Sequence, residues 1–554
     1  MDNLRLILIF SLAFILLLLW QAWNEDYGQS APTAVEQQAA AQNEGTPEVP
    51  KPETGVDAES SLPGIAQPVV SSARSIDVVT DLLTLKIDMR GGNILEIFLN
   101  DFPESLDDPD TKFQLLRSSI PNLFIAQSGL IGTEGSPAPT HEAEYSTTAD
   151  SFALEDGIDA LKVDLFWSDA SGVKVTKRFT FTRGSYLVTV DHVVENSAGG
   201  NWTGREYRQL MRSEPGESDS DSRFLYTYTG GAIYSPAEKY EKISFDDMQG
   251  ATLAREVKDG WIAMLQHYFL GAWIPSRGEE NHFYTNVLSN DRYVLGAYTP
   301  LASVTDGGSH VFSTGFVAGP KLQEELAEMA TGLDLSVDYG WLTIIAQPIF
   351  WLLKKIQSIV GNWGWSIILL TVLIKLAFFK LSETSYKSMA NMRKMTPRIQ
   401  ALKDRFGDDK QRLNAAMMEM YKKEKINPLG GCLPIVVQIP VFIALYWVLL
   451  ESVELRQAPF IFWLKDLSIM DPYYVLPVIM GVSMFIQQKL NPAPPDPMQA
   501  KVMQFLPIMF TGMFAFFPAG LVLYWFCGTI FQLAQQLLMN KKDEKARAAA
   551  PPAK

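Results

Sequence analysis

An apolar stretch that contains a lysine constrains this chain more than any other feature of its sequence. Residues 363–380 are hydrophobic enough to enter a lipid bilayer, yet Lys375 lies within their last turns. Thr371 precedes Lys375 by four residues, so the two polar side chains share one face of a helix. A cation at membrane depth costs at least about 2.5–3.5 kcal/mol on insertion scales, which favours a functional role. The alternative is that the lysine stem reaches the cytoplasmic headgroups near Lys380, about 7.5 Å farther along a helix.

Charge and hydropathy divide the 554-residue chain into two unlike parts. Residues 1–340 contain one strong apolar run, whereas residues 341–540 contain most of the others. The net charge of −15 is equally uneven, because the chain from Lys354 onward carries about +11 and residues 6–353 carry about −26. Basic loops favour the cytoplasmic side of a membrane. We therefore expect the acidic part to lie outside the cytoplasm.

The first apolar run, residues 6–23, is just long enough to span a bilayer. Arg5 precedes it and two acidic residues follow it, which favours a cytoplasmic N-terminus. A cleaved signal peptide is the alternative, but the run is longer than a usual signal core and no Ala-x-Ala-like site follows. We predict an uncleaved anchor over residues 1–23. Residues 24–71, rich in Ala, Gln, Glu and Pro, predict a flexible periplasmic linker.

Residues 72–320 alternate apolar and polar side chains with the period of β-strands. Residues 83–89 and 93–99 flank Arg90-Gly-Gly92 and predict a hairpin. Similar runs continue the series at residues 160–167, 173–182 and 186–195. Many short strands without long helical periods predict a sandwich of antiparallel sheets.

The same region carries no signature of a catalytic or metal site. All five histidines of the chain lie here, but they lack the spacing of metal ligands. Neither a phosphate-binding loop nor a Gly-x-Ser-x-Gly motif occurs. The two cysteines, Cys432 and Cys527, lie in or beside predicted spans, so this region needs no disulfide. We expect no enzyme, metal or cofactor, and leave open a sugar- or peptide-binding groove.

The second part of the chain predicts membrane spans joined by short loops. A charged helix is expected at 321–331, and an amphipathic helix at 341–359, interrupted by Pro348, is expected to lie on the outer membrane surface. The spans are predicted at residues 361–381, 431–450, 473–488, 502–517 and 521–540. They leave a periplasmic loop at 451–472, a cytoplasmic loop at 489–501 and a cytoplasmic tail at 541–554. With the anchor, six spans place both termini in the cytoplasm.

Residues 382–430 predict a cytoplasmic helical hairpin. Apolar residues recur every three or four positions on both sides of a turn at residues 407–410, and Thr396-Pro397 is expected to kink or restart the first arm. Residues 380–427 contain 12 basic and 6 acidic residues. This excess fits a positive-inside signal and is compatible with docking of ribosomes or targeting factors.

Polar residues on three predicted spans favour one interior pocket. Lys375, Gln438 and Tyr524 each lie in an otherwise apolar span, and polar side chains in hydrocarbon seek one another or water. The last span also carries Trp525, Gln532, Gln535 and Gln536. The spans after the anchor contain no acidic residue, which argues against a proton-coupled carrier, although an anion exchanger could use a lone cation.

Several strings of residues resemble the YidC/Oxa/Alb family of membrane protein insertases, in the Gram-negative form with a large periplasmic domain. These strings are WIAMLQ at 261–266, DYGW at 338–341, GNWGWS at 361–366, NPLGGC at 427–432, SVELRQAP at 452–459 and DPYY at 471–474. The resemblance implies six transmembrane α-helices with a five-helix insertase core, a periplasmic all-β supersandwich domain and a cytoplasmic helical hairpin.

The resemblance also implies a hydrophilic groove that is open to the cytoplasm and to lipid. Its residues would be Lys375, Thr371, Gln438, Tyr524 and Trp525, with Phe442 and Met480 as candidates for substrate contact. Many members carry Arg where this chain has Lys375, so bidentate carboxylate pairing is lost here while the charge is kept. Two tyrosines are common where this chain has Tyr524-Trp525.

The function implied is insertion and chaperoning of inner-membrane proteins, alone or with the Sec translocon. Nascent membrane proteins, ribosomes, signal-recognition components and membrane lipids would be its partners, and no nucleic-acid site is inferred. One alternative from another class is an anion transporter that uses Lys375 and a periplasmic receptor domain. A membrane-anchored carbohydrate-modifying enzyme is a third possibility, but it leaves the later spans without a purpose.

Overall fold

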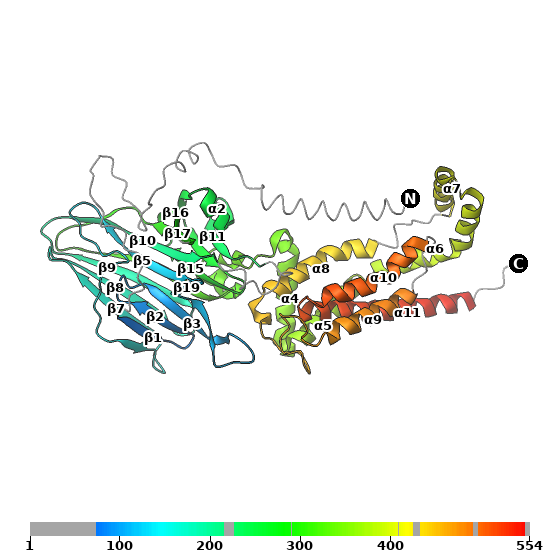
Figure 1. Cartoon of the computed structure of the whole chain (residues 1–554), viewed down its shortest axis with the longest axis horizontal. Coiled ribbons are helices and arrows are strands. Elements are labelled where there is room, and N and C mark those ends of the chain that lie inside the picture. Colours follow the sequence, from blue (N-terminus) through cyan, green and yellow to red (C-terminus); the bar gives the residue numbers. More distant parts are fainter. Residues whose placement is uncertain are drawn as a thin grey trace. The chain divides into compact units, whose positions relative to one another are not determined.

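The computed structural model in Figure 1 describes residues 74–214, 227–289, 291–407, 409–424, 433–490 and 497–548. These residues form two compact units, a β unit within 74–337 and a helical unit within 338–548. The predicted anchor and linker at residues 1–71 lie outside the described residues, as do residues 425–432, residues 491–496 of the predicted cytoplasmic loop and residues 549–554 of the tail.

The β unit consists of two sheets, in agreement with the predicted sandwich, although residues 77–79 and 151–153 pair in parallel where antiparallel pairing was predicted. The larger sheet has the order β13 (Ala254–Lys258), β16 (Glu280–Leu288), β17 (Arg292–Tyr298), β10 (Trp202–Ser213), β5 (Phe124–Gly132), β3 (Ile94–Pro103), β2 (Leu83–Asp88), β1 (Ser75–Val79), β6 (Ser151–Ala153), with β18 (Ala302–Val304) paired to β10 and β4 (Lys112–Leu116) paired to β3. The smaller sheet has the order β12 (Lys239–Ile243), β11 (Gly230–Ser235), β14 (Trp261–Leu265), β15 (Phe269–Pro275), β19 (Ser309–Pro320), β9 (Leu187–Asn196), β8 (Val173–Thr182), β7 (Ala160–Ser168).

The predicted hairpin is confirmed, because β2 pairs with β3 in antiparallel register. Gly91 and Gly92 make its turn with φ angles of +78° and +59°, a region that favours glycine. A side chain at Gly91 would also meet His141, whose carbonyl oxygen lies 1.9 Å from the position of a Cβ. The turn therefore requires glycine for both its backbone angle and its close contact.

Large aromatic side chains fill the space between the sheets. Trp273 on β15 is buried, its ring centroid lies 4.6 Å from that of Phe316, and its indole Nε1 donates to the Gln209 carbonyl at 3.1 Å. Burying a side chain of this size contributes roughly 1.5–3 kcal/mol. A short helix α2 (Phe245–Gly250) and helix α3 (Gln323–Met329) complete the unit. Helix α3 lies within the charged helix predicted at 321–331.

Ionisable side chains also meet inside the sandwich. His192 of β9 contacts Glu206 of β10 at 3.0 Å, and the Arg208 guanidinium lies 2.6 Å from the other carboxylate oxygen. Lys177 of β8 donates to the carbonyls of Gly91 and Ser128, both at 2.9 Å. Burial lowers the pKa of Lys177 to about 7, and it also lowers the pKa of His192. His192 therefore has a buried partner inside the sandwich.

The helical unit contains α4 (Thr343–Val360), α5 (Trp363–Ala377), α6 (Phe379–Phe406), α7 (Lys410–Lys423), α8 (Leu433–Glu451), α9 (Val475–Leu490), α10 (Pro497–Phe514) and α11 (Ala519–Ala548). Pro348 lies inside α4 and does not end it. Helix α4 buries Ala346, Phe350 and Leu353 while leaving Ile344 85% exposed, so its two faces differ as an amphipathic helix requires.

The chain bends within the span that was predicted at 361–381. Helix α5 ends at Ala377, and the following helical segment Phe379–Ser388 departs from its direction by 59°. Helix α6 then continues past Pro397 without a break, so the first arm does not restart there. Arg398 of α6 and Glu424 after α7 form an ion pair at 2.5 Å, which joins the two arms of the hairpin.

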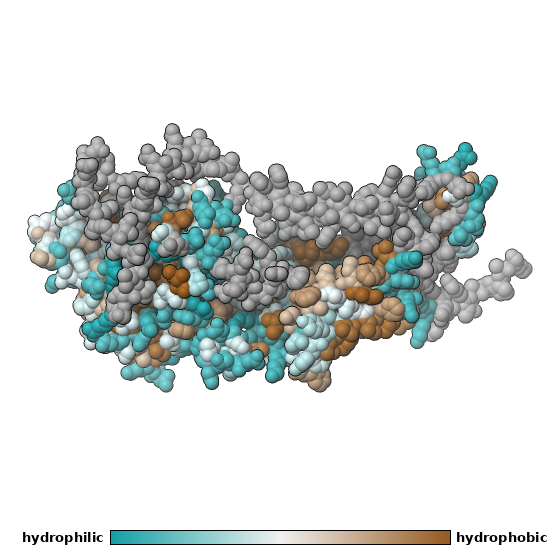
Figure 2. Space-filling model, viewed as in Figure 1, coloured by the Kyte–Doolittle hydropathy of each residue, from teal (hydrophilic) through white to brown (hydrophobic). Residues whose placement is uncertain are grey.

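Apolar side chains gather on the visible face of the helical unit (Figure 2). The exposed large hydrophobic residues of this unit include Leu369, Leu373, Val482, Phe485, Phe505 and Ile508. Within the described residues, Ala519–Lys541 is long and apolar enough to cross a membrane by itself, and the bent pair Trp363–Ala377 and Phe379–Ser388 qualifies jointly. Val437–Glu451 and Val475–Leu490 are shorter apolar helices. The count of six spans therefore stays a prediction.

Candidate functional site

Lys375 lies where three helices of the helical unit meet. Its side chain on α5 is only 7% exposed, and its Nζ donates to Gln438 Oε1 of α8 at 3.1 Å. A Cβ at Gly528 of α11 would lie 3.3 Å from Lys375 Cε, so the α11 backbone passes close to the lysine stem. The ammonium thus faces neighbouring helices instead of extending toward Lys380.

Thr371 is buried on the same helix as Lys375, but its hydroxyl has a local role. Its Oγ1 donates to the Ile367 carbonyl one turn earlier, at 2.7 Å. A threonine that bonds back to its own helix satisfies its polar group without a partner helix. Thr371 therefore contributes packing beside Lys375, whereas its hydroxyl proton is engaged in a hydrogen bond within α5.

The predicted aromatic residues form a cluster between α8, α10 and α11. The ring centroid of Phe442 lies 6.3 Å from that of Tyr524 and 4.8 Å from that of Trp525. Trp525 also contacts Phe514 of α10, with centroids 5.2 Å apart. Met480 of α9 is fully buried, so it is closed to a substrate in this conformation.

The hydrogen bond between Lys375 and Gln438 continues through two more glutamines, which the sequence did not assign to the site. Gln532 of α11 donates from Nε2 to Gln438 Oε1 at 3.4 Å, and Gln487 of α9 donates from Nε2 to Gln532 Oε1 at 3.0 Å. We call Gln438, Gln532 and Gln487 the glutamine chain. With Lys375 it joins α5, α8, α9 and α11 through polar groups. Gly528, Gln532 and Gln535 share one face of α11 at i, i+4 and i+7, but this spacing does not identify their partners on other helices.

The loop after α8 is fixed by residues of the recognised strings. Asp471 accepts from Trp463 Nε1 and from the Tyr473 backbone, both at 3.0 Å, and from the Leu476 backbone at 2.7 Å. Asn362 caps α5 by accepting from the Trp365 backbone at 3.1 Å. Asn362 Nδ2 also donates to the Pro459 carbonyl at 3.1 Å, so these contacts hold the loop against the beginning of α5 and α9.

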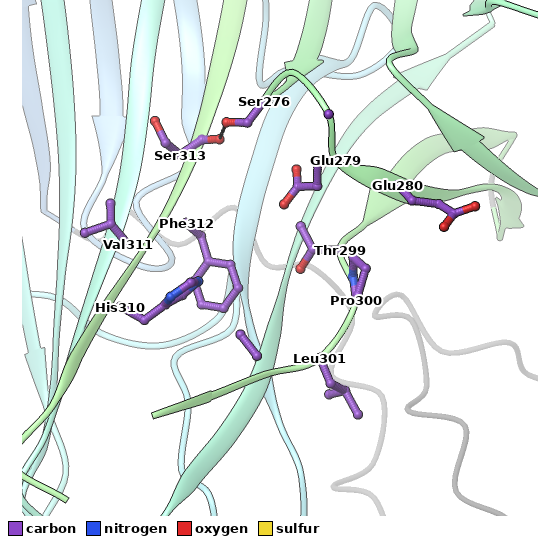
Figure 3. A pocket seen from close by; sticks show the side chains of 12 residues that line it. Ser276, Glu279, Glu280, Thr299, Pro300, Leu301, His310, Val311, Phe312 and Ser313 are labelled. Atoms are coloured by element: carbon purple, nitrogen blue, oxygen red, sulfur yellow. Dashed lines mark hydrogen bonds between the residues drawn. The ribbon is translucent and has the colours of Figure 1, made fainter. Parts of the chain in front are cut away.

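A separate cavity of about 460 Å³ lies in the β unit. Figure 3 shows Glu279 and Thr299 on one side of it and His310 and Phe312 on the other. The rings of His310 and Phe312 have centroids 4.5 Å apart. The cavity offers acceptors, a hydroxyl and an aromatic surface, a mixture suited to a polar ligand. A sugar- or peptide-binding groove, which the sequence neither predicted nor excluded, would be located at this cavity.

Comparisons with known proteins complete this picture. The chain matches the family described as YidC periplasmic domain over residues 75–352 and the family described as 60Kd inner membrane protein over residues 355–546. It is 50% identical over 553 residues to the membrane protein insertase YidC of Methylococcus capsulatus, covering 99% of this chain and 100% of that protein. The corresponding protein of Thioalkalivibrio sulfidiphilus is 50% identical over 560 residues, covering 99% of each.

Among solved structures, the chain is similar to one described as an active YidC insertase with the first transmembrane domain resolved. That likeness has 20% sequence identity and a TM-score of 0.37, and it covers 84% of this chain and 92% of the other. The two curated relatives carry the name of an insertase and are alike over nearly their whole length. The chain therefore belongs to the YidC/Oxa/Alb family of membrane protein insertases, as its motifs predicted.

Proposed function

We propose that this chain inserts inner-membrane proteins, and helps them fold, through a hydrophilic groove centred on Lys375. The observation that carries the proposal is the nearly buried ammonium held by Gln438 from another helix. A lysine within a bilayer is costly unless water or polar groups surround it. Its contact with an amide supports a hydrated space between α5, α8 and α11, as opposed to an exposure to lipid.

The groove would act by replacing hydration that a polar segment loses on entering the membrane. A short acidic or polar tail of a nascent span enters beside Lys375 and the neighbouring amides. A hydrogen bond to a charged group contributes roughly 1.5–3 kcal/mol, so a few such contacts lower the barrier for crossing considerably. The apolar part of the substrate then passes from the groove mouth into lipid. This partitioning drives release, and the chain itself consumes no nucleotide.

The proposed arrangement has six spans and both termini in the cytoplasm. The β unit is periplasmic and the α6–α7 hairpin is cytoplasmic, while α5 and α8–α11 form the insertase core. The basic excess of residues 380–427 supports this orientation. Proposed partners are nascent membrane proteins, the Sec translocon, ribosomes, signal-recognition components and membrane lipids.

Reconstitution into proteoliposomes with a short-tailed, single-span substrate tests the role of the charge. We expect Lys375→Arg to insert as the parent does, Lys375→Ala to insert less, and Lys375→Glu to be the weakest with an acidic tail because it repels that tail. Lys380→Ala is the matched control, since the Lys380 side chain is 91% exposed. Equal insertion by all variants would show that the charge of Lys375 does not contribute to insertion. Flux of a small anion without any insertion would instead favour the transporter.

A further inference from the structure

The side-chain amide of Gln438 has two ends in different situations. Its Oε1 accepts from Lys375 Nζ at 3.1 Å and from Gln532 Nε2 at 3.4 Å. Its Nε2 is buried and has no hydrogen-bond partner among the residues that the structure describes. A buried donor without an acceptor is unfavourable in a resting protein. Such a group is informative when it lies inside a proposed binding groove.

Chemistry fixes which end of the Gln438 amide faces Lys375. A lysine ammonium has three donors and no acceptor, so only the oxygen of Gln438 can meet it. Turning the amide over would place NH₂ against NH₃⁺. The orientation therefore does not depend on distinguishing nitrogen from oxygen by position.

The hydrogen bonds of the glutamine chain agree with this orientation of Gln438. Gln487 donates to Gln532 Oε1 at 3.0 Å, which leaves Gln532 Nε2 as the end that faces Gln438. All donors in the chain thus run toward Gln438 Oε1, whose two lone pairs are occupied by Lys375 and Gln532. Within the described residues, Gln438 Nε2 is the buried amide nitrogen of this chain that has no hydrogen-bond partner.

We infer that Gln438 Nε2 donates to a backbone carbonyl of the passing polypeptide, and that Gln532 and Gln487 are positioning residues that keep this donor available. The inference rests on the proposed groove function. It adds the peptide carbonyl to negative charge as a chemical group that the groove binds. An amide donor recognises any peptide carbonyl, whatever the side chain. Lys375 then favours acidic tails, whereas Gln438 serves uncharged polar tails that the cation alone would not hold.

Two single-span substrates that differ only in an acidic or an uncharged polar tail separate these roles in proteoliposomes. For Gln438→Met and Gln532→Met, we expect insertion of the uncharged tail to fall about 5–10-fold, the effect of one neutral hydrogen bond, and insertion of the acidic tail to fall less. Lys375→Ala should show the opposite preference. Gln487→Met, which touches neither Lys375 nor Gln438, should give a weaker loss with the same preference.

Gln488→Met is the matched control, because Gln488 is the adjacent glutamine of α9, lies outside the glutamine chain, and also has a buried amide atom, Oε1, without a hydrogen-bond partner among the described residues. A general loss of packing would reduce insertion of both tails equally, and that outcome would overturn the inference. Insertion of the uncharged tail at the parental rate by Gln438→Met, Gln532→Met and Gln487→Met would also overturn it. In both cases the parent and its dependence on Lys375 would still support the groove. Failure of the parent to insert either substrate would remove the proposed function itself.

Discussion

Gly481 of α9 provides the sharpest test of how the helices pack. A Cβ at Gly481 would lie 1.9 Å from Thr511 Oγ1 of α10 and 3.1 Å from Thr511 Cβ, well inside ordinary contact. Thr511 cannot simply rotate, because its Oγ1 donates to the Pro507 carbonyl at 2.7 Å. Gly481→Ala must therefore separate the two helices or break this hydrogen bond.

The expected size of the effect follows from these contacts. Overpacking of this kind costs about 1–3 kcal/mol. Replacing glycine by alanine within a helix stabilises the folded state by about 1 kcal/mol, because alanine has the higher helix propensity. Gly512→Ala on α10 is the matched control, because no atom lies within 4 Å of a Cβ built there. We therefore expect Gly481→Ala to be less stable than Gly512→Ala by about 1–3 kcal/mol.

Thermal unfolding of the purified chain in detergent measures this difference. Gly481→Ala should unfold at a lower temperature than the parent, and Gly512→Ala should not. Adding Thr511→Ala to Gly481→Ala removes the hydroxyl that makes the shortest contact, so the double variant should recover part of the loss. If Gly481→Ala and Gly512→Ala unfold together, α9 and α10 do not pack through this glycine and the reasoning is refuted.

Three further predictions concern the cores of the two units. Trp273→Ala should destabilise the β unit by about 3–5 kcal/mol in denaturant unfolding, because it leaves a cavity between the sheets. Burial lowers the pKa of Lys177 from its ordinary value of 10.5 to about 7, so between these pH values the unfolded chain binds one more proton than the folded chain. The free energy of unfolding of the parent should therefore rise from pH 7 to 10.5 relative to that of Lys177→Met. Asn362→Ala removes the cap on α5 and should lower the stability of the helical unit by about 1 kcal/mol, measured by thermal unfolding.

Patterns of short range predicted much of this fold. Alternation of apolar and polar residues identified the strands at 83–99 and 160–195, because half-buried strands impose a period of two. The Gly91-Gly92 turn was visible because few other residues adopt its backbone angles. The order of strands in each sheet was not predictable, since it depends on pairings between strands far apart in sequence.

The bend after α5 shows why other features were missed. Neither proline nor glycine marks Phe378, where α5 ends, so no local signal separates the two helices. Gln535 of α11 donates from Nε2 to the Phe379 carbonyl at 3.2 Å, a contact that only the packed structure creates. The glutamine chain escaped prediction for the same reason. Gln487 and Gln532 belong to different helices, and their register is set by packing and not by spacing.

The polar groups around Lys375 supply the contact that its ammonium needs. An ammonium needs a single acceptor to hold it, and Gln438 supplies one at 3.1 Å. Gln438 Oε1 also accepts from Gln532, and the close approach of Gly528 limits the width of the space beside the lysine stem. A guanidinium keeps the charge, so the insertion expected of Lys375→Arg rests on that charge and not on bidentate pairing. Lys375 therefore fits this glutamine chain as a compact charge, and two of its three donors remain for the polar tail that the proposed groove would receive.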